Sequence, residues 1–389
     1  MSLAPKSKEV FIPCRGERPV FPGFVTYVSA SEPTLLHRFG WVDFSDGYDD
    51  FADSFSQDNG RTWTEPVLRQ KSYEVPEGRV RYAENAAFFD ADLRKLLTFT
   101  SRGLYPKDTV DVDANFEVVF AVFDPATGQY GEEAVLPFEL PGGLAISFCF
   151  PIKTSRGKLL VPAMTKVLDN DGRPVHYQGC WAPVEQPITI IGDYQADGTL
   201  QWRLGGRVPV NVEQNSRGLS ENTLAELRDG RIAMISRGDN SMFPERPGYK
   251  WLCFSEDDGE TWDEPVPLPC DTGDPIESGS NGSALFRSIW NGRLYWMGNL
   301  ALDGRANANW PRTPIVIAEV QEEPFALKRE TITIVDQRAP HEHEHVQMSN
   351  FRFYQDRENG DVVVFLARYG QRDPEKWYLA DYYRYRVSL

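Results

Sequence analysis

Short runs of β-branched and aromatic residues, bounded by Gly, Asp and Asn, recur along the whole chain. Examples are GKLLVPA, GRIAMIS, GRLYWMGN and GDVVVFLARY. Runs of this kind are typical of strands, whereas apolar residues at the spacing of an amphipathic helix are rare here. The 31 glycines and 28 prolines are spread evenly, so no linker divides the chain. The pattern predicts a mostly β chain with a single domain over residues 1–389.

One hairpin pattern repeats along the chain. It consists of an alternating strand, a turn and a second apolar strand, and its copies start at Gly23, Glu84, Ser147, Glu221, Asn281 and Ser349. Successive copies begin between 60 and 74 residues apart, which suits one four-stranded propeller blade with its loops. The sequence therefore predicts an all-β, six-bladed β-propeller of four-stranded antiparallel blades. We expect the last run, WYLADYYRYRVSL, to complete the blade that begins near Gly23.

The composition limits the classes of partner that the chain is expected to bind. With 41% hydrophobic and 25% charged residues, the chain is globular and has no apolar run that suits a membrane span. Its net charge of −16 repels nucleic acid and acidic membrane surfaces. Five widely spaced cysteines without a CxxC pair argue against a disulfide framework or a zinc site, and we expect no cofactor. The first residues, MSLAPKSKEVFIPC, lack the apolar stretch of a signal peptide; compartment and oligomeric state stay open.

The ends of the repeated hairpins carry an unusual share of cations. In a hairpin, the first residue of one strand and the last residue of the next reach the same edge of the sheet. The heads include Asn281, and the tails are His37 with Arg38, Arg102, Lys166, Arg237, Asn299 and Arg368. Such cations in an acidic protein suit the capture of carboxylates. The expected partner is an acidic oligosaccharide held at the propeller axis.

Two turns far apart in the chain are nearly identical. SQDNGRTWTEP runs from Ser56 to Pro66, and SEDDGETWDEP from Ser255 to Pro265. Each turn comes after a repeated hairpin, separated from it by about the length of one strand. The turn between the two outer strands of a blade is expected at this position. They resemble the Asp-box, S-x-D-x-G-x-T-W, of BNR-repeat proteins in the sialidase (neuraminidase) superfamily. In that superfamily the box is a folding element, so the resemblance implies an architecture and not a catalytic group.

The same resemblance implies site residues. SENTLAELRDGRIAMISR is similar to the superfamily segment that carries a catalytic glutamate and a carboxylate-binding arginine, which implies Glu221 and Arg237. NWPRTPIVIAEV implies a second such arginine at Arg312, and FSDGYDDFADSF implies an acid/base at Asp46, with Asp49 as the next choice. These roles imply an exo-acting glycoside hydrolase that recognises a terminal acidic sugar.

The chain departs from the superfamily pattern in two places. The superfamily's N-terminal segment, which carries its first carboxylate-binding arginine, has no clear match here. The comparable stretch is RPVFPGF, in which Arg18 is displaced from the position of that arginine. The nucleophilic tyrosine is also unmatched, because HEHEHVQMSNF places Gln347 or Met348 at its position, and neither attacks an anomeric carbon.

Histidines offer a different chemistry. His341, His343 and His345 alternate along one extended segment, and His345 and His37 are candidate bases. We assign no metal to this segment. Trp310, in GRANANWPRTP, is the preferred aromatic for stacking on a sugar. Besides the hydrolase, two hypotheses therefore stay open: a polysaccharide lyase that uses a histidine base on a uronate-containing glycan, and a sugar-binding propeller without catalysis.

Overall fold

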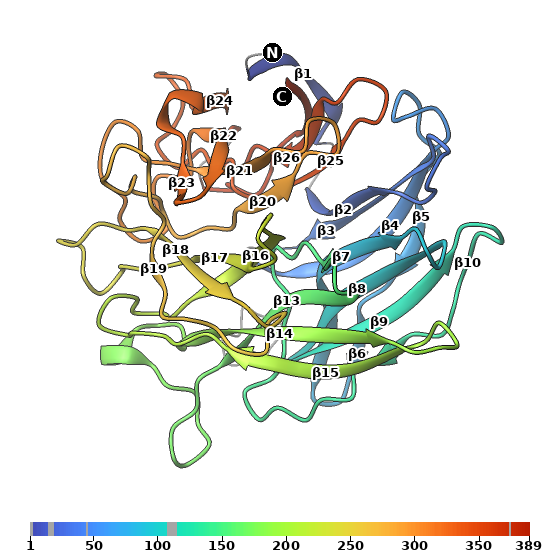
Figure 1. Ribbon diagram of the computed structural model, residues 1–389, viewed down its shortest axis with the longest axis horizontal. Coiled ribbons are helices and arrows are strands. Elements are labelled where there is room, and N and C mark those ends of the chain that lie inside the picture. The colour runs from blue at the N-terminus through green and yellow to red at the C-terminus, as the bar shows by residue number, and fades with distance from the viewer. Residues whose placement is uncertain (1–2, 15–18, 44–45, 107–114, 373–374) are drawn as a thin grey trace. The chain divides into compact units, whose positions relative to one another are not determined.

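The computed structural model describes residues 3–14, 19–43, 46–106, 115–372 and 375–389. Within these residues 27 strands form six antiparallel sheets, and the remaining regular structure is two short 3-10 turns, Tyr177–Gly179 and Arg329–Thr331 (Figure 1). Each sheet contains one of the six predicted hairpins. The predicted fold class, an all-β six-bladed propeller with antiparallel blades, is confirmed, although two of the blades carry additional short strands.

Residue contacts divide the chain into two compact units. The first consists mainly of Pro5–Leu136 and Asn350–Leu389, and the second mainly of Pro137–Ser349. Each unit contains three blades.

The first unit holds the blades from both ends of the chain. One blade contains β2 (Val20–Tyr27), β3 (Leu35–Val42), β4 (Tyr48–Ser56) and β5 (Val67–Gln70). The next contains β6 (Tyr73–Val75), β7 (Gly78–Asp90), β8 (Lys95–Tyr105), β9 (Phe116–Asp124), β10 (Gln129–Tyr130) and β11 (Ala134–Val135). The third contains β1 (Ala4–Ile12), β25 (Phe351–Gln355), β26 (Val362–Ala367) and β27 (Tyr382–Ser388). Leu35, Phe51 and Phe365 are fully buried in the core of this unit.

The second unit holds three consecutive blades. Its first blade contains β12 (Ile152–Lys153), β13 (Lys158–Lys166), β14 (Glu185–Tyr194) and β15 (Leu200–Arg207). Its second contains β16 (Ser220–Glu226), β17 (Ile232–Arg237), β18 (Lys250–Ser255) and β19 (Val266–Pro267). Its third contains β20 (Ala284–Arg287), β21 (Leu294–Asn299), β22 (Ile315–Glu322), β23 (Phe325–Leu327) and β24 (Thr333–Asp336). Leu160, Ile235 and Trp296 are fully buried between these strands.

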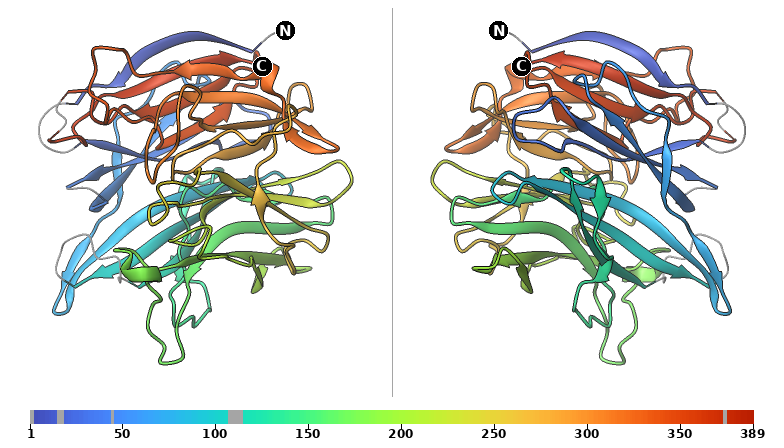
Figure 2. Two further views of the ribbon diagram at one scale, coloured as in Figure 1. Left: turned by 90° about the vertical axis from the view of Figure 1, so that its left-hand side faces the viewer. Right: turned by 90° about the vertical axis from the view of Figure 1, so that its right-hand side faces the viewer.

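The C-terminal strand corrects one expectation. β27 pairs with β26 in its own blade, and not with the blade that begins at β2. The N-terminal strand β1 pairs with the other edge of β27, so strands from both chain ends lie side by side (Figure 2). The blade of β2–β5 needs no further strand, because four consecutive segments already complete it.

The two repeated turns have the same internal hydrogen bonds. In the first, Ser56 Oγ donates to Asp58 at 2.9 Å and accepts from the Gly60 backbone N–H at 2.8 Å; Asp58 in turn accepts from Thr62. Ser255, Asp257, Gly259 and Thr261 repeat this set in the second turn. The turns connect β4 to β5 and β18 to β19, as expected for the outer strands of a blade.

Long apolar helices are absent from the part of the chain that the structure describes, so none of its helices could cross a membrane.

Candidate functional site

Glu221 and Arg237 meet at one end of the β16–β17 hairpin. β16 begins at Ser220, which is paired with Arg237, and the register shifts between Ser220 and Thr223. Glu221 lies in this irregular stretch with a φ of 47°, a left-handed conformation that costs free energy in a residue with a side chain. Its carboxylate accepts a hydrogen bond from Arg237 Nη1 at 2.8 Å. The distortion of the strand thus places one carboxylate against the strand-end arginine.

Lys250 adds a second cation beside this pair. It begins β18 and lies opposite Arg237 in the register of the sheet. Its side chain is buried, and Nζ donates to the Gly279 carbonyl at 3.0 Å, to the Asn281 side-chain oxygen at 3.1 Å and to the Asn281 carbonyl. Burial lowers the pKa of Lys250 to about 7, and the charges of Arg237 and Arg312 act in the same direction, while Glu221 opposes them.

Arg312 supplies the third cation. Its Nη1 donates to the Gln347 side-chain oxygen at 2.8 Å and to Ser349 Oγ at 3.3 Å, and its Nη2 donates to the Ser280 carbonyl at 3.2 Å. The Asn309 carbonyl accepts from Arg312 Nε, and the Asn309 side-chain oxygen accepts from Arg237 Nη2 at 3.1 Å. Asn309 therefore ties the two arginines together.

We call Glu221, Arg237, Lys250 and Arg312 the cationic cluster; all four lie in the second unit. Burial by itself would raise the pKa of Glu221, but the charges of Arg237, Arg312 and Lys250 outweigh it and the pKa is lowered. Glu221 is therefore ionised near neutral pH and lies among three basic side chains, of which Lys250 is only partly protonated there. The side chains of Arg237 and Glu221 remain 11% and 20% exposed. The Arg237–Glu221 pair is therefore partly accessible to solvent.

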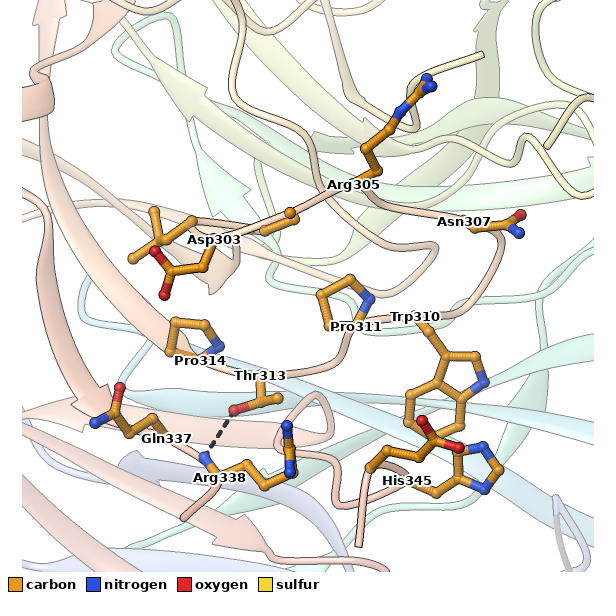
Figure 3. A pocket seen from close by; sticks show the side chains of 14 residues that line it. Asp303, Arg305, Asn307, Trp310, Pro311, Thr313, Pro314, Gln337, Arg338 and His345 are labelled. Carbon is orange, nitrogen blue, oxygen red and sulfur yellow. Dashed lines mark hydrogen bonds between the residues drawn. The ribbon is translucent and has the colours of Figure 1, made fainter. Parts of the chain in front are cut away.

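A cavity of about 540 Å³ lies beside Trp310, one residue after Asn309. Trp310 stacks on His345 with ring centroids 4.7 Å apart and an interplanar angle of 23°. Figure 3 shows these two rings together at one side of the cavity, with Asp303 and Gln337 on the other side. Its wall combines aromatic and proline faces with polar side chains, a composition that suits a sugar. Trp310 and His345, both predicted from the sequence, are thus brought together.

His37 is placed differently from the expectation. It lies near the start of β3 and not at a strand end, is fully buried, and its Nε2 is 3.0 Å from the Tyr382 hydroxyl. Phe365 and Trp63 pack against its ring. Burial lowers its pKa to about 3, so the imidazole is neutral and shielded. His37 as a catalytic base was therefore a wrong prediction, because β3 continues to Val42, past the end that the apolar pattern suggested.

Arg38 is also a core residue. It is 1% exposed, and its guanidinium donates to both carboxylate oxygens of Asp53, its register partner on β4, at 2.7 and 2.8 Å. Tyr130 accepts from the same guanidinium at 2.8 Å. The predicted substrate contact is corrected: the charge of Arg38 is satisfied within its own sheet and the neighbouring blade.

Three other predicted cations have different positions. Arg102 lies inside β8, which continues to Tyr105, and its guanidinium pairs with Glu117 on β9, so it is no strand tail. Lys166 does end β13, opposite Glu185. Arg368 directly follows β26 but is 3% exposed. The expected run of cations at strand ends is therefore wrong at Arg102, whereas Lys166 and Arg368 do lie at strand ends.

The remaining predicted residues divide between the units. Asp49 is buried and accepts from Arg79 at 2.8 Å, a contact that makes it an ion-pair partner. Asp46 is exposed, and its charge helps burial to raise the pKa of the Tyr369 phenol. Asn281 is buried, and its side-chain oxygen accepts a hydrogen bond from Lys250. Arg18 lies outside the described residues.

Three residues of the site carry no recognisable signal in the sequence. Lys250 is one lysine before an apolar run, and only the sheet register shows that it faces Arg237. Asn309 and Gln347 are polar loop residues that gain their roles from the two arginines. Gln347 and Met348, at the position expected for a nucleophile, are both buried. No group of three or more His, Cys, Asp or Glu among the described residues has the geometry to hold a metal ion.

Comparison with known proteins places the fold. No protein-family model matches the chain, and no curated protein matches it in sequence. Among solved structures, a protein of unknown function from Dyadobacter fermentans aligns with a TM-score of 0.68 at 13% identity, covering 100% of this chain and 99% of that one. The K499G mutant of the NanB sialidase from Streptococcus pneumoniae aligns with a TM-score of 0.64 at 13% identity, covering 98% of this chain and 70% of that one. The fold resembles that of sialidases.

A third neighbour is the intramolecular trans-sialidase from Ruminococcus gnavus, with a TM-score of 0.64 at 12% identity, covering 98% of this chain and 97% of that one. Because the identities are so low, these alignments support the sialidase-like propeller fold and nothing finer.

Proposed function

We propose that this protein binds the carboxylate of an acidic sugar at the cationic cluster and acts on the glycan as an exo-acting glycoside hydrolase. The observation that carries the proposal is the local charge: Arg237, Arg312 and Lys250, the last with a pKa of about 7, gather around Glu221 in a chain of net charge −16. A guanidinium presents two parallel N–H groups to a carboxylate, and Arg237 and Arg312 are held at a fixed spacing by Asn309.

The chemistry follows from the same groups. An ionised Glu221 stabilises the positive charge that develops on a sugar ring during glycosidic bond cleavage. Trp310 supplies an aromatic face for the sugar. The names of two structural neighbours, a sialidase and an intramolecular trans-sialidase, make sialosides the first substrates to test. Asp46 as acid/base rests on the sequence resemblance, and an Asp46→Asn variant tests it separately.

A second candidate is a lyase acting on a uronate-containing glycan. It is favoured by the position of His345, which is exposed and lines the cavity beside Trp310. A histidine there has access to solvent and to a ligand, as a base that abstracts a proton from a sugar carbon requires. His37, the other candidate base, is buried and drops out.

The test is a screen of the purified protein against a fluorogenic sialoside and a set of uronate-capped oligosaccharides. Release of sugar from the sialoside, lost in Arg237→Gln and Arg312→Gln, supports the hydrolase. A rise in ultraviolet absorbance with uronates, lost in His345→Ala, supports the lyase instead. Binding without turnover, abolished by Arg237→Gln, indicates a sugar-binding propeller. If no acidic sugar binds, the proposed function is wrong.

The matched control is Arg228→Gln. Arg228 carries the same charge as Arg237 but lies at the opposite end of the β16–β17 hairpin, so its loss should leave sugar binding and turnover unchanged.

A further inference from the structure

Trp181 is an exposed aromatic residue held in a fixed position. Its side chain is 59% exposed, yet Cys180 before it and Ala182 after it are buried. The Cys180 carbonyl lies 2.9 Å from His176 Nδ1, and the Val184 backbone N–H donates to the Val175 carbonyl at 2.7 Å. An exposed indole on an anchored loop leaves apolar surface in water, which is typical of a ligand contact.

Arg217 stacks on this indole. Its guanidinium carbon lies 4.6 Å from the centre of the Trp181 ring, a cation–π contact. The Nε atom is buried and has no hydrogen-bond partner. Within the described ranges the guanidinium makes neither a hydrogen bond nor an ion pair to the protein. A desolvated donor without a partner is costly, and the residue as a whole is only partly buried, so Arg217 is open in part to solvent and to an external acceptor.

The backbone fixes Arg217 beside the cationic cluster. The Ser216 N–H donates to the Asp239 carbonyl at 2.9 Å, two residues beyond Arg237, and the Glu185 N–H donates to the Arg217 carbonyl at 2.9 Å. Gly218 permits this approach, because a Cβ there would lie 1.9 Å from the Glu185 carbonyl oxygen. Arg217 is therefore held rigidly and close to Arg237.

The nearby carboxylate of Asp239 does not pair with Arg217. It accepts from Ser216 Oγ at 2.7 Å, from Ser280 Oγ at 3.1 Å and from the Ser241 backbone N–H at 3.0 Å. Burial and then the charge of Arg237 lower the pKa of Arg217. The carboxylates of Glu185 and Asp239 oppose this shift without reversing it, so a bound anion would offset the remaining repulsion and give the unpaired donor an acceptor.

We propose that Arg217 and Trp181 form a second anion subsite next to the cationic cluster, which binds an oxyanion, carboxylate or sulfate, on a second sugar of the same glycan. Arg217 pairs with the oxyanion, and the free part of the Trp181 face packs against the sugar ring. This inference rests on the proposed function and sharpens it: the preferred glycan carries two acidic groups on neighbouring sugars.

The test compares affinities for one and two acidic groups. Isothermal titration with the methyl glycoside of sialic acid, its disialoside and a sulfated sialoside, together with galacturonate and digalacturonate, covers the carboxylate and sulfate sources. Wild-type protein should bind a diacid about tenfold more tightly than the corresponding monoacid, the gain of one charge-assisted contact. Arg217→Gln should abolish the preference for the diacid. Trp181→Phe should retain most of this preference, and Arg228→Gln should leave it unchanged.

The outcomes separate the two proposals. If monoacids bind but wild type shows no diacid preference, or if Arg217→Gln weakens monoacid and diacid binding equally, the second subsite is wrong while the proposed function stands. If no sugar binds, the proposed function fails, and inorganic sulfate then tests the subsite alone. Sulfate should raise the melting temperature of wild type more than that of Arg217→Gln, and equal shifts overturn the subsite.

Discussion

Arg38 and Arg237 are both arginines on the second strand of a blade, but their cross-strand neighbours differ. The register partner of Arg38 on β4 is Asp53, a carboxylate that satisfies it with two hydrogen bonds. The register partner of Arg237 on β18 is Lys250, a second cation. Arg38 is therefore neutralised within its own sheet in the first unit, whereas Arg237 has a basic register partner and takes its hydrogen-bonded carboxylate from Glu221, in the irregular part of β16. The neighbour on the adjacent strand thus decides whether a buried arginine lies next to a counter-charge or next to a second basic group.

The largest expected effect comes from breaking the Arg38 pair. Asp53→Asn leaves a buried guanidinium without its counter-charge, so the free energy of unfolding should fall by about 3–5 kcal/mol. Urea denaturation measures it. Asp193→Asn is the matched control: Asp193 pairs with Lys158 and Arg203 at a partly exposed site, and there we expect a loss of about 1 kcal/mol or less. Equal losses in the two variants would contradict the core role of the Arg38 pair.

The converse change in the cationic cluster should strengthen ligand binding. Glu221→Gln removes the carboxylate that competes for Arg237 and leaves the three cations in place, so affinity for an acidic sugar should rise about five- to tenfold. Turnover, if measured on the same sugar, should be lost. Titration calorimetry checks the affinity, with Glu226→Gln at the other end of β16 as the control. Weaker binding in Glu221→Gln would show that Glu221 itself contacts the ligand.

Lys250 makes the cluster sensitive to pH. Its pKa is lowered to about 7 from 10.5, so between these values the folded protein binds fewer protons than the unfolded chain, and the free energy of unfolding should rise with pH. Below pH 7 Lys250 is protonated in both the folded and the unfolded protein, so its contribution to the free energy of unfolding no longer changes with pH. Affinity for an acidic sugar should instead weaken, about threefold to tenfold, as pH rises through 7 and one cation is lost.

Lys250→Met should remove both pH dependences, while Lys158→Met, at the opposite end of the neighbouring blade's β13, should retain them. Unchanged pH profiles in Lys250→Met would rule out Lys250 as the titrating group.

The smallest effects are expected at the two repeated turns, which lie outside both arginine environments. Asp58→Ala and Asp257→Ala each remove the acceptor of a threonine, and each should lower the melting temperature by a few degrees without changing ligand affinity. Asp257→Ala should cost more, because Trp262 in its turn is buried while Trp63 is half-buried. A change in sugar affinity in either variant would connect these turns to the site.

Local sequence determined most of the fold. Alternation of apolar residues and the chemistry of Gly, Asp and Asn turns act over one hairpin, so all six hairpins and the two repeated turns lie where the pattern indicated. Strand lengths were less certain, because an apolar run does not mark where pairing ends. Because β3 and β8 continue further than the apolar runs indicated, Arg38 and Arg102 were wrongly predicted to end their strands. For the same reason the burial of His37 was not predicted.

The site itself was decided by tertiary structure. The sequence alone indicated Glu221, Arg237 and Arg312. It did not indicate that Lys250 faces Arg237, that Asn309 joins the two arginines, or that Arg217 has a buried Nε without a hydrogen-bond partner. These relations depend on sheet register and on loops that meet only after the chain folds. The sequence gives the type of each ionisable residue. The charges that surround it, which set its pKa, depend on how the folded chain packs.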